Sequence, residues 1–157
     1  MITKELIKSI DIFRELDDSE TEKLTAIARE ETYKKGDYIF KEKDPGGKVY
    51  IVESGVVEIG KSSRGNGKFI RLARLERGEI LGELSIFEET QRSASALASL
   101  VPETKLIVWD ATTLQKLFVE ETNIANKVTR NLLKKMCMRL RLASEAIYTL
   151  LNVIDSH

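Results

Sequence analysis

The sequence predicts a mainly β protein with helices at both ends, and three patterns along the chain support this fold class. Between about residues 35 and 110, short β-rich segments alternate with glycine-containing turns, as in sandwiches and barrels. The first thirty residues and the stretch after 111 instead carry apolar residues at helical spacing. A chain of 157 residues is expected to form one domain: N-terminal helices at 1–34, a β unit at 35–110 and C-terminal helices at 111–157.

Two helices are predicted in the N-terminal part. A second helix is expected to begin at Ser19, because residues 19–22 have the form of a capping box. The first helix is indicated by apolar residues at helical spacing: Leu6, Ile7, Ile10 and Phe13.

The middle of the chain is predicted to form short strands at 38–40, 49–52, 56–59, 69–72 and 105–109. Turns that contain glycine separate them, at 44–47, 54–55, 65–67 and 77–78. The apolar run 81–87 interrupts this series, because it encloses a carboxylate, Glu83, and has no period of two.

The C-terminal helix is predicted to carry a heptad seam over 133–154. A narrow seam favours a second helix as partner and therefore a homodimer, whereas a helix packed on its own domain usually shows a broader apolar stripe. Packing on the β unit of the same chain is the alternative. The seam residues are Leu133, Met136, Leu140, Ala143, Ile147, Leu150 and Ile154.

Composition argues against several classes of function. Lysine plus arginine equals aspartate plus glutamate, at 25 each, so we expect no general attraction to nucleic acid or membrane. Cys137 is the only cysteine and His157 the only histidine, so neither catalysis by a cysteine or histidine nor a metal site is expected. No signal peptide or membrane span is apparent, which predicts a cytoplasmic location. No cofactor is expected.

A candidate anion site lies around Glu83 and Arg92. A buried carboxylate needs a partner and accepts hydrogen bonds, for example from a sugar hydroxyl. Gly82 would let a ligand approach the backbone, and the first amides of a short helix at 84–88 would face an anion. Arg92 offers a forked charge suited to phosphate, and Ser93 adds a hydroxyl. An ion pair between Glu83 and Arg92 is the alternative.

The run Gly82-Glu83-Leu84-Ser85, followed by Arg92-Ser93-Ala94, resembles the phosphate-binding cassette of the cyclic-nucleotide-binding domain family, which includes the catabolite activator protein and the regulatory subunits of protein kinase A. We refer to residues 82–94 as the cassette. The segment 36–57 is similar to the first strands of that family. The resemblance implies a jelly-roll-like β-roll (a double-stranded β-helix) between N-terminal helices and a long C-terminal dimerisation helix.

The resemblance also implies roles for individual residues. Glu83 would take the ribose hydroxyl, and Arg92 with the amides of Leu84 and Ser85 would take the cyclic phosphate. The roll residues Ile59 and Leu72 would pack on the base, although a plain role in the core explains them equally well.

On the C-terminal helix, the resemblance places Arg139 where an arginine reaches the cassette. It places Ser144 where a serine of the partner subunit meets the adenine. Ala143 stands where a threonine is found in the activator and cannot donate a hydrogen bond, and a solvated Ser144 is the alternative.

The expected function is therefore that of a regulatory sensor that binds cAMP, or less favourably cGMP, since Ser93 excludes neither base. The chain ends at His157 without a helix-turn-helix segment, so we expect no direct contact with nucleic acid. The signal would pass to an unknown downstream partner through rearrangement of the C-terminal helix. The alternative is a structural dimerisation module that binds no ligand, and an enzyme is not expected.

Overall fold

Two four-stranded antiparallel sheets form the centre of the structure, a computed structural model that describes residues 2–155. The first sheet has the order β1-β8-β3-β6 and the second the order β2-β7-β4-β5. The strands are β1 (Arg29–Lys34), β2 (Tyr38–Phe40), β3 (Lys48–Ser54), β4 (Val56–Ser62), β5 (Phe69–Leu75), β6 (Ile80–Leu81), β7 (Ser95–Ser99) and β8 (Glu103–Asp110).

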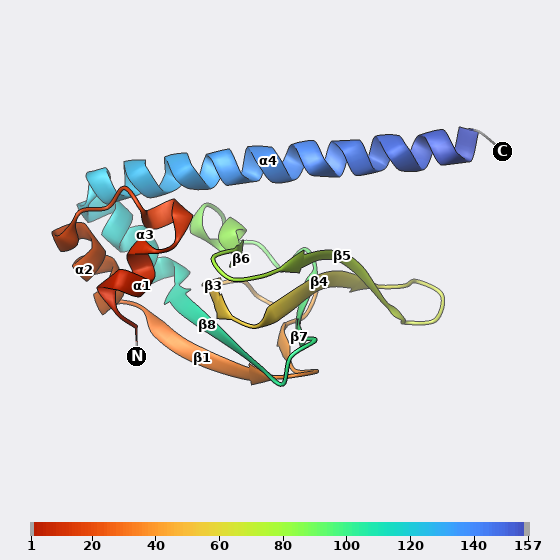
Figure 1. Cartoon of the computed structure of the whole chain (residues 1–157), viewed down its shortest axis with the longest axis horizontal. Coiled ribbons are helices and arrows are strands. Elements are labelled where there is room, and N and C mark those ends of the chain that lie inside the picture. Colours follow the sequence, from red (N-terminus) through yellow and green to blue (C-terminus); the bar gives the residue numbers. More distant parts are fainter. Residues whose placement is uncertain (1, 156–157) are drawn as a thin grey trace.

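Helices flank the sheets at both ends of the chain, and a short one interrupts the strands (Figure 1). They are α1 (Lys4–Lys8), η1 (Asp11–Phe13), α2 (Asp18–Ala26), η2 (Glu83–Ile86), α3 (Ala111–Glu120) and α4 (Thr122–Asp155). The predicted fold class, a β-roll between N-terminal helices and a long C-terminal helix, is confirmed.

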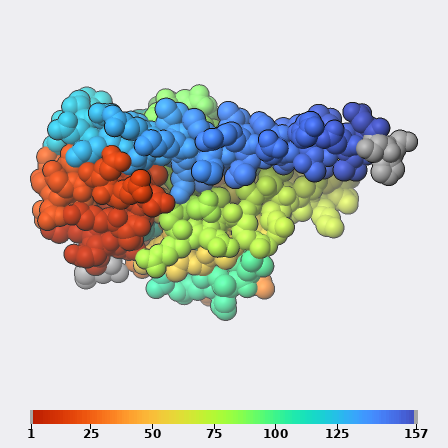
Figure 2. Space-filling model, turned by 45° about the horizontal axis from the view of Figure 1, so that its top comes forward, coloured from red at the N-terminus to blue at the C-terminus, as the bar shows by residue number. Residues whose placement is uncertain are grey.

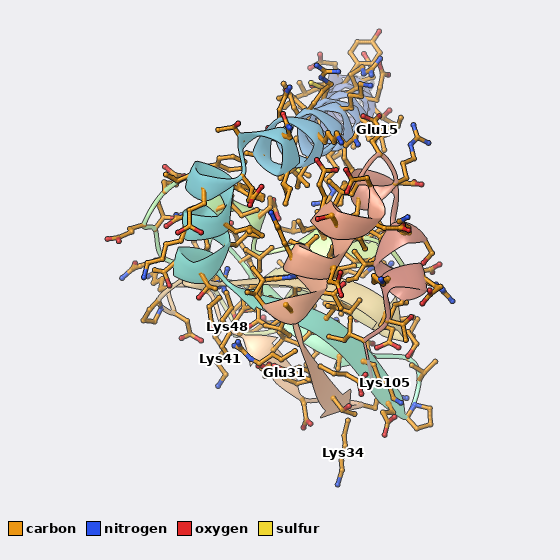
Figure 3. All side chains as sticks on the ribbon, turned by 90° about the vertical axis from the view of Figure 1, so that its left-hand side faces the viewer. Glu15, Glu31, Lys34, Lys41, Lys48 and Lys105 are labelled. Carbon is orange, nitrogen blue, oxygen red and sulfur yellow. The ribbon has the colours of Figure 1, made fainter. Side chains whose placement is uncertain are left out.

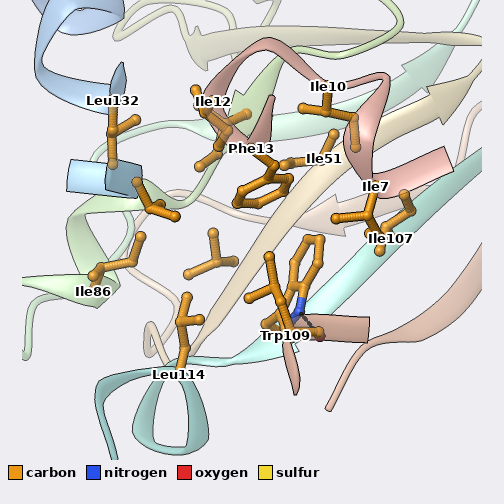
Figure 4. Close-up of a cluster of buried hydrophobic side chains, with 14 of the residues drawn as sticks. Ile7, Ile10, Ile12, Phe13, Ile51, Ile86, Ile107, Trp109, Leu114 and Leu132 are labelled. Carbon is orange, nitrogen blue, oxygen red and sulfur yellow. Dashed lines mark hydrogen bonds between the residues drawn. The ribbon is translucent and has the colours of Figure 1, made fainter. Parts of the chain in front are cut away.

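The hydrophobic core has two parts. One lies between the N-terminal helices, the strands β3 and β8, and the first half of α4, with Trp109 and Phe13 near its middle (Figure 4). The other lies between the two sheets and includes Tyr50 and Val108. Because β3 and β8 contribute to both parts, these strands are apolar on both faces and appear as uninterrupted apolar runs in the sequence.

Helix α4 packs on the domain with its first half only. Ile124, Val128, Asn131 and Leu132 are buried there, whereas every residue from 140 to 155 is exposed. Figures 1 and 2 show the second half running along the β4–β5 hairpin, with only its end reaching beyond the hairpin. None of the helices in residues 2–155 combines the length and apolar character that a bilayer span requires.

Residues 29–34 form strand β1, so the prediction of helices throughout 1–34 is wrong at its end. All six residues pair with β8, from Arg29 opposite Val108 to Lys34 opposite Glu103. This pairing with a distant segment outweighs the weak strand pattern of a mostly charged hexapeptide.

The predicted capping box at Ser19 is also wrong. Helix α2 is capped by Asp17, whose carboxylate accepts from the Glu20 amide at 2.8 Å. The Glu20 carboxylate in turn accepts from the Asp17 amide at 2.9 Å. The reciprocal pair thus begins two residues earlier than predicted, because an aspartate and a glutamate three apart meet the same geometric requirement.

Candidate functional site

A cavity of about 170 Å³ opens between the second sheet, the cassette and α4. Its walls come from β2, β4, β5 and β6, from residues 82–85 and 90–94, and from Arg139 of α4. Most of the predicted site residues therefore lie around one space. Apolar walls with a few convergent polar groups are typical of sites for small ligands.

Gly82 turns the chain from β6 into η2. Its φ of +75° lies in the left-handed region, which residues with a Cβ rarely adopt. A Cβ built on Gly82 would lie 2.6 Å from Nη1 of Arg92 and 2.8 Å from the Lys48 carbonyl oxygen. The sequence suggested that this glycine admits a ligand, and in the structure it also makes room for the arginine.

We expect Gly82→Ala to destabilise the fold more than Gly78→Ala, as measured by urea denaturation followed by circular dichroism. Gly78 also has a positive φ, +82°, but a Cβ there meets nothing within 4 Å. Both variants should lose about 1 kcal/mol to backbone strain, and only Gly82→Ala adds the collision with Arg92. Equal losses for the two variants would show that both the Arg92 guanidinium and the Lys48 carbonyl move aside freely.

Arg92 is buried, with only 7% of its surface exposed. Its Nη1 donates to Oγ of Ser85 at 3.3 Å, and its Nη2 donates to the Lys48 carbonyl at 2.8 Å. Its Nε–H has no hydrogen-bond partner among the described residues. Burial lowers the pKa of the guanidinium, while nearby Tyr50 and Glu83 oppose this shift. The result is a desolvated cation with an unsatisfied donor beside a cavity.

The side chain of Lys48 is also held in place. Its ammonium donates to the Glu31 carboxylate at 3.0 Å, and both side chains are visible in Figure 3. The carbonyl that accepts from Arg92 therefore belongs to the first residue of β3, an inner strand of the first sheet, whose side chain is held by β1.

Ser85 uses both its hydroxyl and its amide in hydrogen bonds within the protein. Its Oγ accepts from the Gly47 amide at 3.1 Å as well as from Arg92. Its own amide donates to the Gly82 carbonyl at 3.2 Å. The expectation that this amide faces open space is therefore wrong, because the tight 3-10 turn of η2 already uses it.

Glu83 approaches Arg139 rather than Arg92. Its Oε1 lies 3.9 Å from Nη1 of Arg139, and no ion pair joins it to Arg92 among the described residues. Nη2 of Arg139 donates to the Ile80 carbonyl at 2.8 Å. The predicted alternative, an internal Glu83–Arg92 pair, is not formed, and Arg139 reaches the cassette as the resemblance implies.

The cassette is also tied to α3. Nε2 of Gln115 donates to the carbonyls of Ser85 and Ile86, at 3.3 and 3.0 Å. Gln115 thus satisfies carbonyls at the C-terminal end of η2, while Arg139 holds the residue that begins it. The two C-terminal helices contact both ends of the same short turn.

Of the two apolar residues expected to pack on the base, only Ile59 lines the cavity. Leu72 is 62% exposed and lies outside it. The pairing of β4 with β5 shifts register next to Ile59, which faces Ala73, whereas Gly60 faces Arg71. Leu72 is the extra residue in this bulge, and Ala73 occupies the wall in its place.

Of the remaining predicted site residues, two line the cavity and one does not. Ser93 and Leu84 line the cavity and are exposed at its mouth. Ser144 is exposed on α4 and is not part of the cavity wall of its own chain.

Sequence reasoning missed Phe40 and Gln115 as site residues. Phe40 lies in the first-strand motif, yet its spacing gives no sign that its ring covers Arg92, with Cζ 4.3 Å from the ring centroid. Gln115 has no local signal, since its hydrogen bonds join segments thirty residues apart.

Comparison with known proteins identifies this arrangement. A family model of the cyclic nucleotide-binding domain matches residues 30–121, which include both sheets apart from Arg29, and the whole cassette. The N-terminal domain of a transcriptional regulator from Streptomyces coelicolor A3(2) has the same fold, with a TM-score of 0.71 and 30% identity. The similarity covers 90% of this chain and 94% of that one.

Two relatives show the same similarity in sequence. The chain is 32% identical over 97 residues to a cGMP-dependent protein kinase of Plasmodium berghei, covering 62% of this chain and 11% of the kinase. It is 26% identical over 145 residues to the CRP-like cAMP-activated global transcriptional regulator of Mycobacterium tuberculosis, covering 92% of this chain and 63% of the regulator. The chain thus spans about a tenth of the kinase and less than two thirds of the regulator. Family model, fold and cassette agree, and the chain belongs to the cyclic nucleotide-binding domain family.

Proposed function

We propose that this cavity binds a cyclic nucleotide and prefers cAMP to cGMP. The observation that carries the proposal is the Arg92 guanidinium, which is buried, lines the cavity and keeps an unsatisfied Nε–H. An unmade hydrogen bond of a buried donor costs about 1–3 kcal/mol, so an anion that accepts from it is bound favourably. A cyclic phosphate supplies one negative charge and two free oxygens for the fork of an arginine.

Glu83 and the neighbouring apolar wall suit the rest of such a ligand. The carboxylate accepts from the ribose 2′-hydroxyl, and Arg139 orients it from 3.9 Å. Ile59 packs on the base together with Ala73 and Leu75, which line the same wall. The preference for cAMP is supported by the mycobacterial cAMP-activated regulator, whose similarity extends over 92% of this chain.

The phosphate would be held by fewer amides than the sequence suggested. Since the Ser85 amide donates within η2, we assign the phosphate to Arg92, the Leu84 amide and the Ser93 hydroxyl. Leu84, near the start of the cassette, and Ser93, near its end, both line the cavity.

We also infer that the exposed half of α4 forms a homodimer. The seam residues Leu133, Leu140, Ile147, Leu150 and Ile154 are all exposed in the single chain. In a parallel pair of helices, a g position faces the e position that follows it on the partner. With the seam at a and d, Arg139 is a g residue and Ser144 is the e residue five positions later. A parallel dimer would therefore bring the Ser144 of one chain beside the Arg139, and hence the cavity, of the other.

Leu140→Glu is expected to convert the dimer to a monomer in analytical ultracentrifugation. The matched control is Leu142→Glu, since Leu142 lies two residues further on the same helix and is equally exposed, at 64% against 69% for Leu140. Leu142 falls outside the seam, so its variant should remain dimeric. Loss of the dimer in both variants, or in neither, would contradict the predicted seam.

Ligand binding would be communicated through α3 and α4. A phosphate that binds Arg92 competes for the donors now given to Ser85 and Lys48. Ser85 is joined to α3 through Gln115, and Glu83 approaches α4 through Arg139. We infer that rearrangement of the cassette shifts these helices for a downstream partner, as a regulatory rather than a catalytic domain does.

Titration calorimetry with cAMP, cGMP and 5′-AMP tests the proposal. We expect cAMP to bind more tightly than cGMP, and 5′-AMP least tightly, since its phosphate is not closed onto the ribose. Tighter binding of cGMP would overturn the base preference.

A structural dimerisation module is the second candidate, favoured by the internal partners that Arg92 and Glu83 already have. Absence of binding by either cyclic nucleotide at millimolar concentration would favour this second candidate and overturn the first.

A further inference from the structure

Phe40 is turned toward the cavity by an irregularity in β2. The register between β2 and β7 shifts there, with Tyr38 opposite Leu97 but Phe40 opposite Ala96. A bulge of this kind breaks the alternation of a strand and re-aims a side chain. As a result, Ile39 is buried in the core between the sheets, while the adjacent Phe40 packs against the same core and lines the cavity.

The ring of Phe40 covers the Arg92 guanidinium. Cζ of Arg92 lies 4.3 Å from the centroid of Phe40 and 5.8 Å from that of Tyr50. The two rings lie 5.9 Å apart and are tilted by 37°. Both distances are within the range of cation–π attraction, which is strongest where the cation is desolvated, and Arg92 is buried.

The backbone holds the two side chains in this relation. The Arg92 amide donates to the Asp44 carbonyl, and the Lys43 amide donates to the Arg92 carbonyl, each at 2.8 Å. Residues 43 and 44 lie three and four positions after Phe40. The hydrogen bonds from Nη1 and Nη2 hold the far end of the guanidinium, and the buried Nε–H has no hydrogen-bond partner among the described residues.

We propose that Phe40 is a positioning residue that fixes the plane of the Arg92 guanidinium and so orients this group toward an anionic ligand in the cavity. The identity of that ligand rests on the proposed function, but the stacking itself does not. Hydrogen bonds at one end leave the group free to tilt, and a ring over its face removes that freedom. Phe40 acts on the ligand through Arg92.

Calorimetry on three variants tests the effect on binding. Phe40→Leu keeps an apolar side chain but removes the π face, and cAMP should then bind about tenfold more weakly. Phe40→Tyr and Phe40→Trp keep the face and should retain affinity within about threefold. Tyr38→Leu is the control, because Tyr38 lies on the same strand and faces Lys41 rather than Arg92. Equal affinities of Phe40→Leu and wild type would overturn the proposal.

Nuclear magnetic resonance of the ligand-free protein provides a second, independent measurement. The Hε proton of Arg92 should resonate upfield in the wild type, because the guanidinium lies over an aromatic face, and should lose this shift in Phe40→Leu. An unshifted Hε in the wild type overturns the proposal, whether or not the leucine variant folds. If wild type shows the shift but binds no cyclic nucleotide, the proposed function fails while the stacking stands. Weaker binding of Phe40→Leu with an unchanged Hε would mean that Phe40 contacts the ligand directly, which also overturns positioning.

Discussion

Arg92→Ala should weaken the binding of cAMP by about 1.5 to 3.5 decades. Loss of one partner from a desolvated, hydrogen-bonded charge pair costs roughly 2–5 kcal/mol, and only 7% of Arg92 is exposed. The variant removes the only cation that combines such burial with an unsatisfied donor at the cavity in residues 2–155. Titration calorimetry with cAMP measures the change.

Two further variants separate this effect from a general change of charge. Arg74→Ala also removes one positive charge, but Arg74 pairs with Glu58 on the β4–β5 hairpin and does not line the cavity. Its affinity should match that of the wild type. Arg92→Lys keeps the charge without the planar fork, so it should lie between wild type and alanine. An Arg92→Ala protein that remains folded and binds cAMP as the wild type does would refute the assignment of the phosphate.

The cassette was predictable because its chemistry is local in sequence. Gly82 and Glu83 are adjacent, and Arg92 follows at a characteristic spacing, so the residues themselves specify one loop. The structure places all three around one cavity. Sequence could not decide whether Glu83 would pair with Arg92, because that depends on Arg139, which comes more than fifty residues later.

The wall of the cavity was predicted less well, since it depends on strand register. A single bulge beside Ile59 moves Leu72 out of the wall and brings Ala73 into it. A shift of one residue reverses the faces of a strand, and no glycine or proline lies in residues 69–75 to announce it. The bulge before Phe40 was hidden for the same reason.

The strands that the sequence did not reveal are those defined by their partners. β1 is mostly charged and is ordered by β8, and β6 has only two residues. β7 consists of small residues that carry little strand preference, and it is held between β2 and β4. The apolar strands β3 and β8, which cross both parts of the core, could be predicted because burial itself requires their composition.

Trp109→Ala should cost about 3–5 kcal/mol of unfolding free energy, the range for truncating a large aromatic residue in a core. Trp109 is 1% exposed, and its ring meets that of Phe13 edge to face at 5.6 Å (Figure 4). It joins β8 to the N-terminal helices, since its Nε1–H donates to the Leu24 carbonyl at 3.1 Å. A domain of this size has a total stability of about 5–15 kcal/mol, so the variant would lose a large part of it.

Trp109→Phe divides this cost into packing and hydrogen bonding. Phenylalanine keeps most of the contact with Phe13 but leaves the Leu24 carbonyl without its donor, which should cost about 1–3 kcal/mol. Urea denaturation followed by circular dichroism is required, because Trp109 is the only tryptophan. Tyr148→Ala, on the exposed half of α4, is the control and should stay within about 0.5 kcal/mol of wild type.

Trp109 lies in the core and not at the cavity. Saturating cAMP should therefore raise the midpoint of urea denaturation of Trp109→Phe as it does that of the wild type. A variant that folds but gains nothing from cAMP would show that the N-terminal helices, and not the cassette alone, determine the affinity.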